Sequence, residues 1–329
     1  MINPVIAESM VCRRLILLAL LGIVAPGAFA QNYPAHAIKL VVPSSPGGGT
    51  DIVGRILAQK LSEQMGQQVV VENRAGAGTI IGNDAVAKSA PDGYTLLMGL
   101  STLAINPSMY AKLPYDALRD FAPVSQAVSS PNILTLHPSV PAKTVKELIA
   151  LAHAKPGSIT FGSAGLGTSP HLSGELFKTL AHIDMVHVPF KGSGQSVISQ
   201  IAGEIAANFP SVPTAMPYLK AGRLRGLGVT TAKRALALPE VPSIAEAGVP
   251  GYEATQWFGL LAPAGTPRAI IDRLYQESSR AVRSADVRER LIAEGLDVIG
   301  STPEEFASYI KSETDKWTKV IKAAGIKPQ

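Results

Sequence analysis

The chain has 329 residues, of which 46% are hydrophobic, and a formal net charge of +5. Basic and acidic residues are interspersed, without a basic block or an aromatic-studded patch, so nucleic-acid binding is not indicated. The only cysteine in the sequence is Cys12, which lies in an expected leader segment. Disulfides, thiol catalysis and cysteine–zinc sites are therefore excluded for the chain that remains after cleavage.

The first residues have the pattern of a secretory leader. Arg13 and Arg14 precede a short apolar run, and Ala28 and Ala30 occupy the small-residue positions before Gln31. This order predicts a cleavable signal peptide over residues 1–30. The alternative, a buried N-terminal helix, rarely carries this order of charged, apolar and small residues. No later cysteine is available to carry a lipid, so we expect a periplasmic protein without an anchor.

The next segment, "IKLVVPSSPGGGTDIVGRILAQKL" over residues 38–61, predicts a strand, a glycine loop and a helix. "QQVVVENRAGAG" predicts a second strand and glycine loop, followed by a helix through about Lys88. "GYTLLMGLS" and "NILTLHP" predict further strands. The alternation of strands and helices indicates an α/β fold with largely parallel sheets.

Helix starts in the second half of the chain carry recognisable caps. Thr144 and Glu147 form a capping box before "VKELIALAHA", and Thr302 and Glu305 form another before the last helix. Between them, "ITFGSAGLGTSPHLSGELFKTL" repeats the order of strand, glycine loop and helix. Thr266 is expected as an N-cap with Pro267 at the first helical position. The last helix places four residues on one apolar face, which we expect in the core: Phe306, Ile310, Trp317 and Ile321.

Two glycine loops carry the chemistry that the residues suggest: the first glycine loop, residues 45–51, and the second glycine loop, residues 163–169. A helix N-terminus offers unpaired N–H groups and partial positive charge, and glycine lets an anion approach them. The alternative is that these glycines serve only turns and helix packing. Asp51 is expected to cap its helix, although it could also meet a polar ligand group. His171 could touch a ligand or pack at its helix start.

Other site types lack their residues. The first glycine loop has no Lys-Ser/Thr pair, and "GLGTSP" departs from the dinucleotide pattern at its last position. No G-x-S-x-G elbow or H-E-x-x-H motif occurs, and no nucleophile–base pair is apparent. His182 and His187 make a poor metal pair, so structural or surface roles are expected for both. We therefore expect no catalytic site, cofactor or metal.

Blocks such as "VVPSSPGGGTDIVGR", "FGSAGLGTSPHLSGELFK", "MVHVPFKGSG" and "WFGLLAPAGTP" resemble the Bug (TctC) family of tripartite tricarboxylate transporter substrate-binding proteins. The resemblance implies an α/β, type II-like periplasmic binding protein clamshell with two domains joined by two crossing strands. Residues 31–128 plus 256–329 would form domain 1, and residues 129–255 domain 2. The family's ligand carboxylates are held by loops of both domains, partly through ordered water. The implied ligand-binding residues are Ser45, Pro46, Gly47, Gly48, Gly49, Thr50, Asp51, Ser101, Thr102, Ser163, Ala164, Gly165, Gly167, Thr168, Ser169, Phe190 and Lys191, with His171 added from its position.

Departures from the family pattern narrow the expected ligand. Leu103 stands where many relatives have His, Phe190 replaces the usual Tyr, and Ala206 and Pro210 replace acidic residues of some relatives. An ammonium group would need a carboxylate partner. We therefore expect an organic acid without an amino group, with aromatic acids among the candidates. Asp51 is the reservation, because its carboxylate could serve an ammonium group.

The resemblance implies a monomeric solute receptor that delivers a small carboxylate to a TctA/TctB-type membrane permease. A ligand sensor that acts on a membrane histidine kinase is the first alternative, and the sequence does not separate the two. A periplasmic enzyme on the same fold is a weaker alternative, because it would need the missing nucleophile–base pair.

Overall fold

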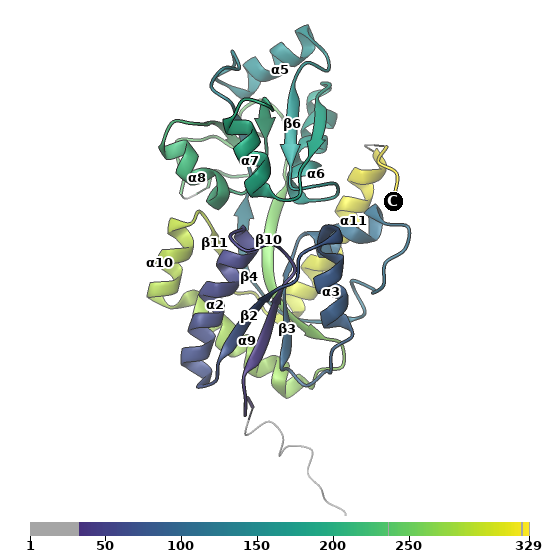
Figure 1. Cartoon of the computed structure of the whole chain (residues 1–329), viewed down its shortest axis with the longest axis vertical. Coiled ribbons are helices and arrows are strands. Elements are labelled where there is room, and N and C mark those ends of the chain that lie inside the picture. The colour runs from purple at the N-terminus through teal and green to yellow at the C-terminus, as the bar shows by residue number, and fades with distance from the viewer. Residues whose placement is uncertain (1–32, 236, 324, 329) are drawn as a thin grey trace, which may run out of the picture. The chain divides into compact units, whose positions relative to one another are not determined.

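The computed structural model describes residues 33–235, 237–323 and 325–328. The expected signal peptide and Cys12 lie outside these residues. The chain divides into two units at Ala35, and the fold described below is that of the second unit, His36–Gln329 (Figure 1). Within the described residues, no helix has both the length and the apolar character needed to cross a membrane.

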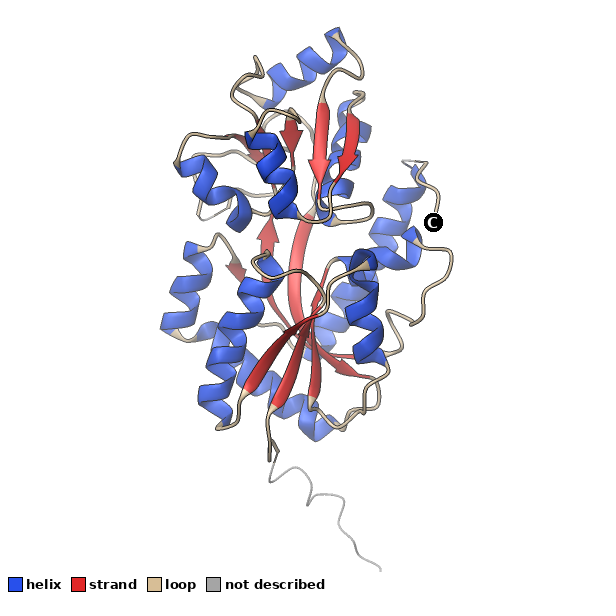
Figure 2. Ribbon diagram, in the orientation of Figure 1, coloured by secondary structure: helices blue, strands red, loops and turns tan. Residues whose placement is uncertain are grey.

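The second unit contains two β-sheets. The six-stranded sheet has the order β11-β4-β10-β3-β1-β2, and the five-stranded sheet has the order β7-β6-β8-β5-β9. Figure 2 shows helices flanking the strands of both sheets. The strands of the first sheet are β1 (Ile38–Val42), β2 (Val69–Asn73), β3 (Thr95–Leu100), β4 (Phe121–Pro131), β10 (Thr255–Pro263) and β11 (Asp297–Val298). Those of the second are β5 (Ile133–Leu136), β6 (Thr160–Ser163), β7 (Val186–Pro189), β8 (Ala207–Asn208) and β9 (Arg225–Val229).

The helices alternate with these strands along most of the chain, as the sequence predicts. Those that begin before residue 200 are α2 (Gly49–Met65), η1 (Ala77–Thr79), α3 (Ile80–Ala87), α4 (Thr102–Met109), α5 (Val145–Ala154), α6 (Ser169–Ala181) and α7 (Ser193–Ile201). The later ones are α8 (Val212–Lys220), α9 (Arg268–Arg283), α10 (Ala285–Ala293) and α11 (Pro303–Ala323).

The expectation of largely parallel sheets is wrong, because both sheets are mixed. β1 pairs in parallel with β2 and β3, and β6 pairs in parallel with β7 and β8. β10, however, runs antiparallel to both β3 and β4, and β5 runs antiparallel to β8 and β9. The α/β class is confirmed. The strand directions were missed because apolar patterns do not encode whether a strand returns from the opposite end of the sheet.

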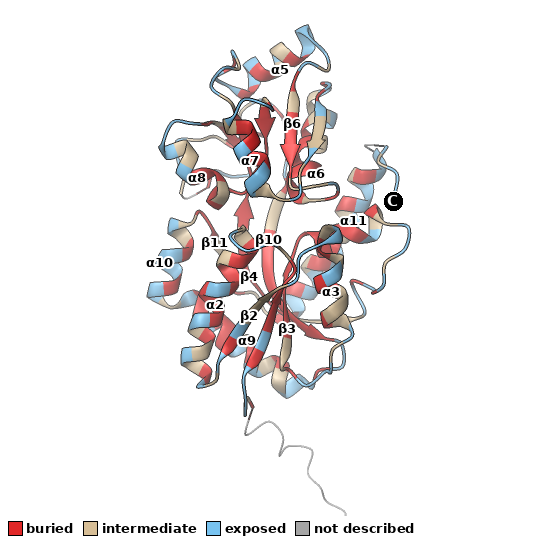
Figure 3. Cartoon of the chain, in the orientation of Figure 1, coloured by how far each residue is buried: buried red, intermediate tan, exposed pale blue. Residues whose placement is uncertain are grey.

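The core has separate clusters on the two sheets, and α11 contributes to both. Phe306 and Ile310 pack with Trp257 in a cluster on the six-stranded sheet. Trp317 and Ile321, farther along α11, belong to the cluster on the five-stranded sheet. All four apolar residues of α11 are buried, which confirms the predicted core face. Figure 3 shows buried and exposed stretches alternating along this helix. Burial of each such side chain stabilises the fold by roughly 1.5–3 kcal/mol.

The N-cap at Thr144 and the capping box at Thr302 agree with the structure, whereas Asp51 is not an N-cap, because Gly48 holds that position and Asp51 lies in the first turn of α2. Thr144 Oγ1 accepts the Glu147 N–H at 3.1 Å, and Thr302 Oγ1 accepts the Glu305 N–H at 3.2 Å. The Glu305 carboxylate in turn accepts the Thr302 N–H at 2.8 Å, which completes that capping box. Thr266 is not an N-cap, because Pro267 holds that position and the Thr266 hydroxyl donates to the Pro263 carbonyl.

Candidate functional site

Both glycine loops lie at the carboxyl ends of parallel strands. The first glycine loop follows β1, and Ser101 follows β3, which pairs in parallel with β1. The second glycine loop follows β6, and Phe190 follows β7, the parallel neighbour of β6. Carboxyl ends of parallel strands share one sheet edge, where open α/β sheets bind ligands. Each glycine loop is therefore placed with a second candidate segment of its own sheet.

The first glycine loop is held by the side chain of Asp51. Its Oδ2 accepts the Gly47 N–H at 2.9 Å and Arg55 Nε at 3.0 Å, and its Oδ1 accepts Asn73 Nδ2 at 2.9 Å. Burial alone would raise the pKa of Asp51, but the bonds from Arg55, Gly47 and Asn73 lower the pKa below its usual value. Asp51 is only 3% exposed, so its carboxylate serves the start of α2.

The three glycines of the first glycine loop differ in what the fold requires of them. Gly47 has φ +80°, a conformation that favours glycine. A Cβ at Gly49 would lie 3.2 Å from the Phe258 ring and 3.6 Å from Ser211 Oγ. Gly48, the N-cap, has φ −82° and ψ 166°, and a Cβ there would lie 3.7 Å from the Ser45 carbonyl oxygen. Neither its backbone nor its packing requires glycine at position 48.

In the segment after β3, the hydroxyl of Thr102 has a hydrogen-bond partner among the described residues and that of Ser101 has none. Thr102 Oγ1 lies 2.8 Å from Thr79 Oγ1, which also accepts Asn83 Nδ2 at 3.3 Å. Ser101 is fully buried, and its Oγ has no hydrogen-bond partner among the described residues. Buried hydroxyls are normally paired, so Ser101 Oγ has capacity for a partner from outside this set.

The second glycine loop repeats the construction of the first with different side chains. α6 begins at Ser169 after the N-cap Thr168. His171 Nδ1 accepts the Gly167 N–H at 3.1 Å, four residues back, as Asp51 does for Gly47. The Thr168 hydroxyl donates to the Gly165 carbonyl at 2.7 Å. In both loops a side chain in the first helical turn fixes the preceding glycine.

His187, which the sequence assigned a structural or surface role, lies beneath the second glycine loop. Its Nε2 is 2.7 Å from Ser163 Oγ, and its ring centroid is 4.1 Å from that of His171. Burial lowers the pKa of His171 to about 3 and that of His187 to about 4, and the positive charge of Lys178 contributes to both shifts. Both imidazoles are therefore neutral at pH 7.

Ser163 and His187 form a serine–histidine contact, whereas no nucleophile–base pair was apparent from the sequence. The expectation that such a pair is absent is corrected to this extent. A catalytic pair of this kind uses a histidine oriented by an acidic group. Here the charged neighbour of the histidines is Lys178, a cation. The Ser163 hydroxyl is fully buried and also accepts the Gly165 N–H at 3.1 Å. The contact therefore fits loop support better than nucleophilic chemistry.

The remaining candidates lie beside these loops. The Phe190 N–H donates to the Ser163 carbonyl at 3.1 Å, and Lys191, next in the chain, is exposed. Ser211, the N-cap of α8, was not predicted, although a serine before Val-Pro is a recognisable helix start. Its Oγ lies 2.9 Å from Thr214 Oγ1 and would be 3.6 Å from a Cβ at Gly49, so Ser211 lies close to the first glycine loop.

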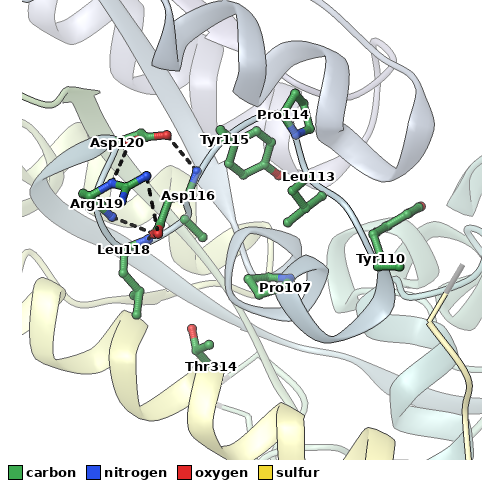
Figure 4. A pocket seen from close by; sticks show the side chains of 12 residues that line it. Pro107, Tyr110, Leu113, Pro114, Tyr115, Asp116, Leu118, Arg119, Asp120 and Thr314 are labelled. Carbon is green, nitrogen blue, oxygen red and sulfur yellow. Dashed lines mark hydrogen bonds and ion pairs between the residues drawn. The ribbon is translucent and has the colours of Figure 1, made fainter.

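A separate surface pocket of about 590 Å³ lies elsewhere, between the segment after α4 and the middle of α11 (Figure 4). Tyr110, Tyr115, Leu118 and Thr314 are among its lining residues, and none of the predicted ligand residues lines it. Among the described residues, no group of three or more His, Cys, Asp or Glu side chains is arranged to hold a metal ion.

Comparison with known proteins identifies the family. The sequence profile described as "Tripartite tricarboxylate transporter family receptor" (TctC) matches residues 53–326. Protein BugT of Bordetella pertussis is 40% identical over 316 residues, covering 95% of this chain and 96% of BugT.

Two solved structures share the fold along most of their length. R. palustris Rpa4515 with adipate has a TM-score of 0.87 and 37% identity, covering 90% of this chain and 100% of that one. MatC from Rhodopseudomonas palustris with bound malate has a TM-score of 0.82 and 30% identity, covering 88% of this chain and 100% of MatC. The chain therefore belongs to the tripartite tricarboxylate transporter receptor (Bug/TctC) family, whose solved members are periplasmic, clamshell-type solute receptors that include carboxylate-bound examples.

Proposed function

We propose that this protein captures a small organic acid without an amino group and delivers it to a tripartite tricarboxylate-type membrane transporter. The observation that carries the proposal is the pair of glycine loops, each leading from a parallel strand into a helix. The ligands of the two similar structures, adipate and malate, are dicarboxylates without an amino group, which supports the same class of ligand here.

The proposed recognition uses backbone N–H groups at the starts of α2 and α6. The first N–H groups of a helix have no acceptor within it and carry partial positive charge. The Gly47 and Gly167 N–H groups are already bonded to Asp51 and His171. The proposed donors to carboxylate oxygens are the N–H groups from Gly48 onward in the first glycine loop and from Ser169 onward in the second, because the Thr168 N–H donates to the Gly165 carbonyl at 3.4 Å.

The exclusion of an amino group rests on the use of Asp51. Its two carboxylate oxygens accept bonds from Gly47, Arg55 and Asn73, which leaves about one of their four lone-pair sites for a ligand ammonium group. The reservation about Asp51 is thereby reduced. The argument for an aromatic acid is also reduced, because Leu103 is fully buried in a core cluster and Phe190 alone remains as its support.

The proposed binding residues are those of the two glycine loops, Ser101, Thr102, Phe190 and Lys191, with Ser211 added. His171 and Asp51 are proposed to hold the loops in place. The proposed domains remain residues 31–128 plus 256–329 and residues 129–255, so that the ligand would bind between them. All strands of the five-stranded sheet fall between Ile133 and Val229, which supports this division.

Thermal-shift measurements with matched acids test the proposal. Succinate and aspartate differ by one amino group, as do glutarate and glutamate, and succinamide serves as the uncharged control. A ligand that binds only the folded state raises Tm with the logarithm of its saturation. We expect shifts with succinate, glutarate or adipate and smaller ones with the amino acids. A larger shift with aspartate than with succinate would refute the amino-group argument, and no shift with any acid would refute carboxylate binding.

A further inference from the structure

We propose that His187 is a positioning residue for ligand binding, which holds the second glycine loop in its binding conformation without contacting the ligand itself. It acts through Ser163 and His171, with which it forms the histidine cluster. The inference rests on the proposed function, because it concerns the loop that would hold a carboxylate. Nothing in the sequence pattern pointed to His187, which is 24 residues from Ser163 along the chain.

The polar edge of His187 supports the beginning of the loop. Its Nε2 lies 2.7 Å from Ser163 Oγ, and this oxygen accepts the Gly165 N–H at 3.1 Å. Gly165 has φ +124°, so its backbone is held in a conformation that few other residues adopt. Loss of the imidazole would leave the buried Ser163 hydroxyl with only its contacts to the Gly165 N–H and carbonyl, both at 3.1 Å and both within the loop itself.

The face of the ring supports the other end of the loop. The His187 ring packs at a tilt against the rings of His171, at a centroid distance of 4.1 Å, and Phe161, at 4.9 Å. His171 Nδ1 accepts the Gly167 N–H at 3.1 Å, so this nitrogen carries no proton. His187 therefore fixes the ring whose nitrogen fixes Gly167. Two backbone N–H groups of the loop, at Gly165 and Gly167, bond directly to members of the histidine cluster.

The cluster supports the loop without placing a negative charge beneath it. The titratable and charged groups acting on His187 are His171 and Lys178, both on α6, while Phe161 and Ser163 on β6 are uncharged. Lys178 forms an ion pair with Glu175 at 3.0 Å. In the first glycine loop the corresponding acceptor, Asp51, is a carboxylate paired with Arg55, whereas in the second the neutral ring of His171 accepts the Gly167 N–H.

Two substitutions separate positioning from packing. His187→Phe keeps an aromatic ring against His171 and Phe161 but removes the bond to Ser163, and His187→Gln keeps a polar partner for Ser163. His153→Phe, at an exposed position near the end of α5, is the control for the substitution itself. Affinity is measured by calorimetry at pH 7 with succinate, glutarate and adipate. Hydrogen exchange of the Gly165 and Gly167 amides is measured on the same unliganded proteins.

We expect His187→Phe to weaken binding about 5- to 10-fold, as for one lost hydrogen bond, and to speed exchange at both glycine amides. His187→Gln should restore most of the affinity, and His153→Phe should change neither quantity. The inference is overturned if His187→Phe binds the acids and exchanges its glycine amides as the wild type does. It is also overturned if the Phe and Gln variants lose affinity equally and in proportion to their loss of Tm. If wild-type protein binds none of the three acids, the proposed function fails, and unchanged exchange would then show separately that His187 does not hold the loop.

Discussion

Gly48→Ala separates the requirements of ligand binding from those of folding. The Gly48 backbone, with φ −82° and ψ 166°, is open to any residue, and the added methyl group would make an ordinary 3.7 Å contact with the Ser45 carbonyl oxygen. Alanine is a poorer N-cap than glycine, but it also loses less chain entropy on folding, and the two effects nearly cancel. We expect the free energy of unfolding of the unliganded protein to change by less than about 0.5 kcal/mol.

Binding should respond differently, because the methyl group would lie next to the Gly48 N–H, a proposed donor to the carboxylate. Loss of one hydrogen bond to a charged group costs about 1.5–3 kcal/mol, which is roughly 10- to 100-fold in Kd. Calorimetry with succinate measures this loss, and urea melts without ligand measure the stability. Gly66→Ala is the control, since Gly66 has φ +70° at the far end of α2 and a Cβ there has no neighbour within 4 Å.

Gly66→Ala should lower stability by about 1 kcal/mol through backbone strain and leave succinate binding unchanged. The reasoning is refuted if Gly48→Ala binds succinate as tightly as the wild-type protein does. It is equally refuted if the Gly66 variant loses affinity to the same extent, because the loss would then follow stability and not the site.

Two further predictions concern the second glycine loop. The pKa values of His171 and His187, about 3 and about 4 in the folded protein against 6.5 ordinarily, mean that the unfolded chain binds more protons below pH 6.5. The free energy of unfolding should therefore be at its full value above pH 6.5 and fall by roughly 3 kcal/mol per histidine as the pH drops to 4. Urea melts from pH 4 to 8 on the wild type and His171→Gln measure this loss. If the free energy of unfolding falls with pH in parallel for the two proteins, the prediction is contradicted. Gly174→Ala should destabilise the protein by about 1–3 kcal/mol, because a Cβ there would lie 2.2 Å from the Phe161 ring. A Tm equal to that of the wild type would show that α6 can move away from β6.

The features that the sequence predicted correctly depend on neighbours a few residues apart. The N-cap bond at Thr144 and the capping box at Thr302 each join residues three positions apart, and the apolar face of α11 repeats with the helical period. The positions of both glycine loops between strand and helix were predictable for the same reason. Local pattern was sufficient wherever local geometry determined the structure.

The contacts that the sequence missed join residues far apart in the chain. His187 on β7 contacts Ser163 on the neighbouring parallel strand β6, and Asn73 at the end of β2 donates to Asp51. Such contacts depend on strand order and register, which single-sequence patterns do not contain. For Asp51 the prediction was partly correct. A role at the helix start was expected, but its carboxylate accepts the N–H of Gly47, which precedes the N-cap, and this bond depends on how the loop folds back.

The place of β10 in its sheet has a consequence for the order in which the newly made chain can fold. β10 is the strand between β3 and β4, yet it begins at Thr255, after every strand of the five-stranded sheet. During synthesis from the N-terminus, β4 therefore emerges long before the strand that connects it to β3. The cluster on the five-stranded sheet also waits, because Trp317 and Ile321 come from the last helix. The polypeptide thus reaches its native packing only when nearly all of it has been made, and until then it persists as an incompletely folded chain.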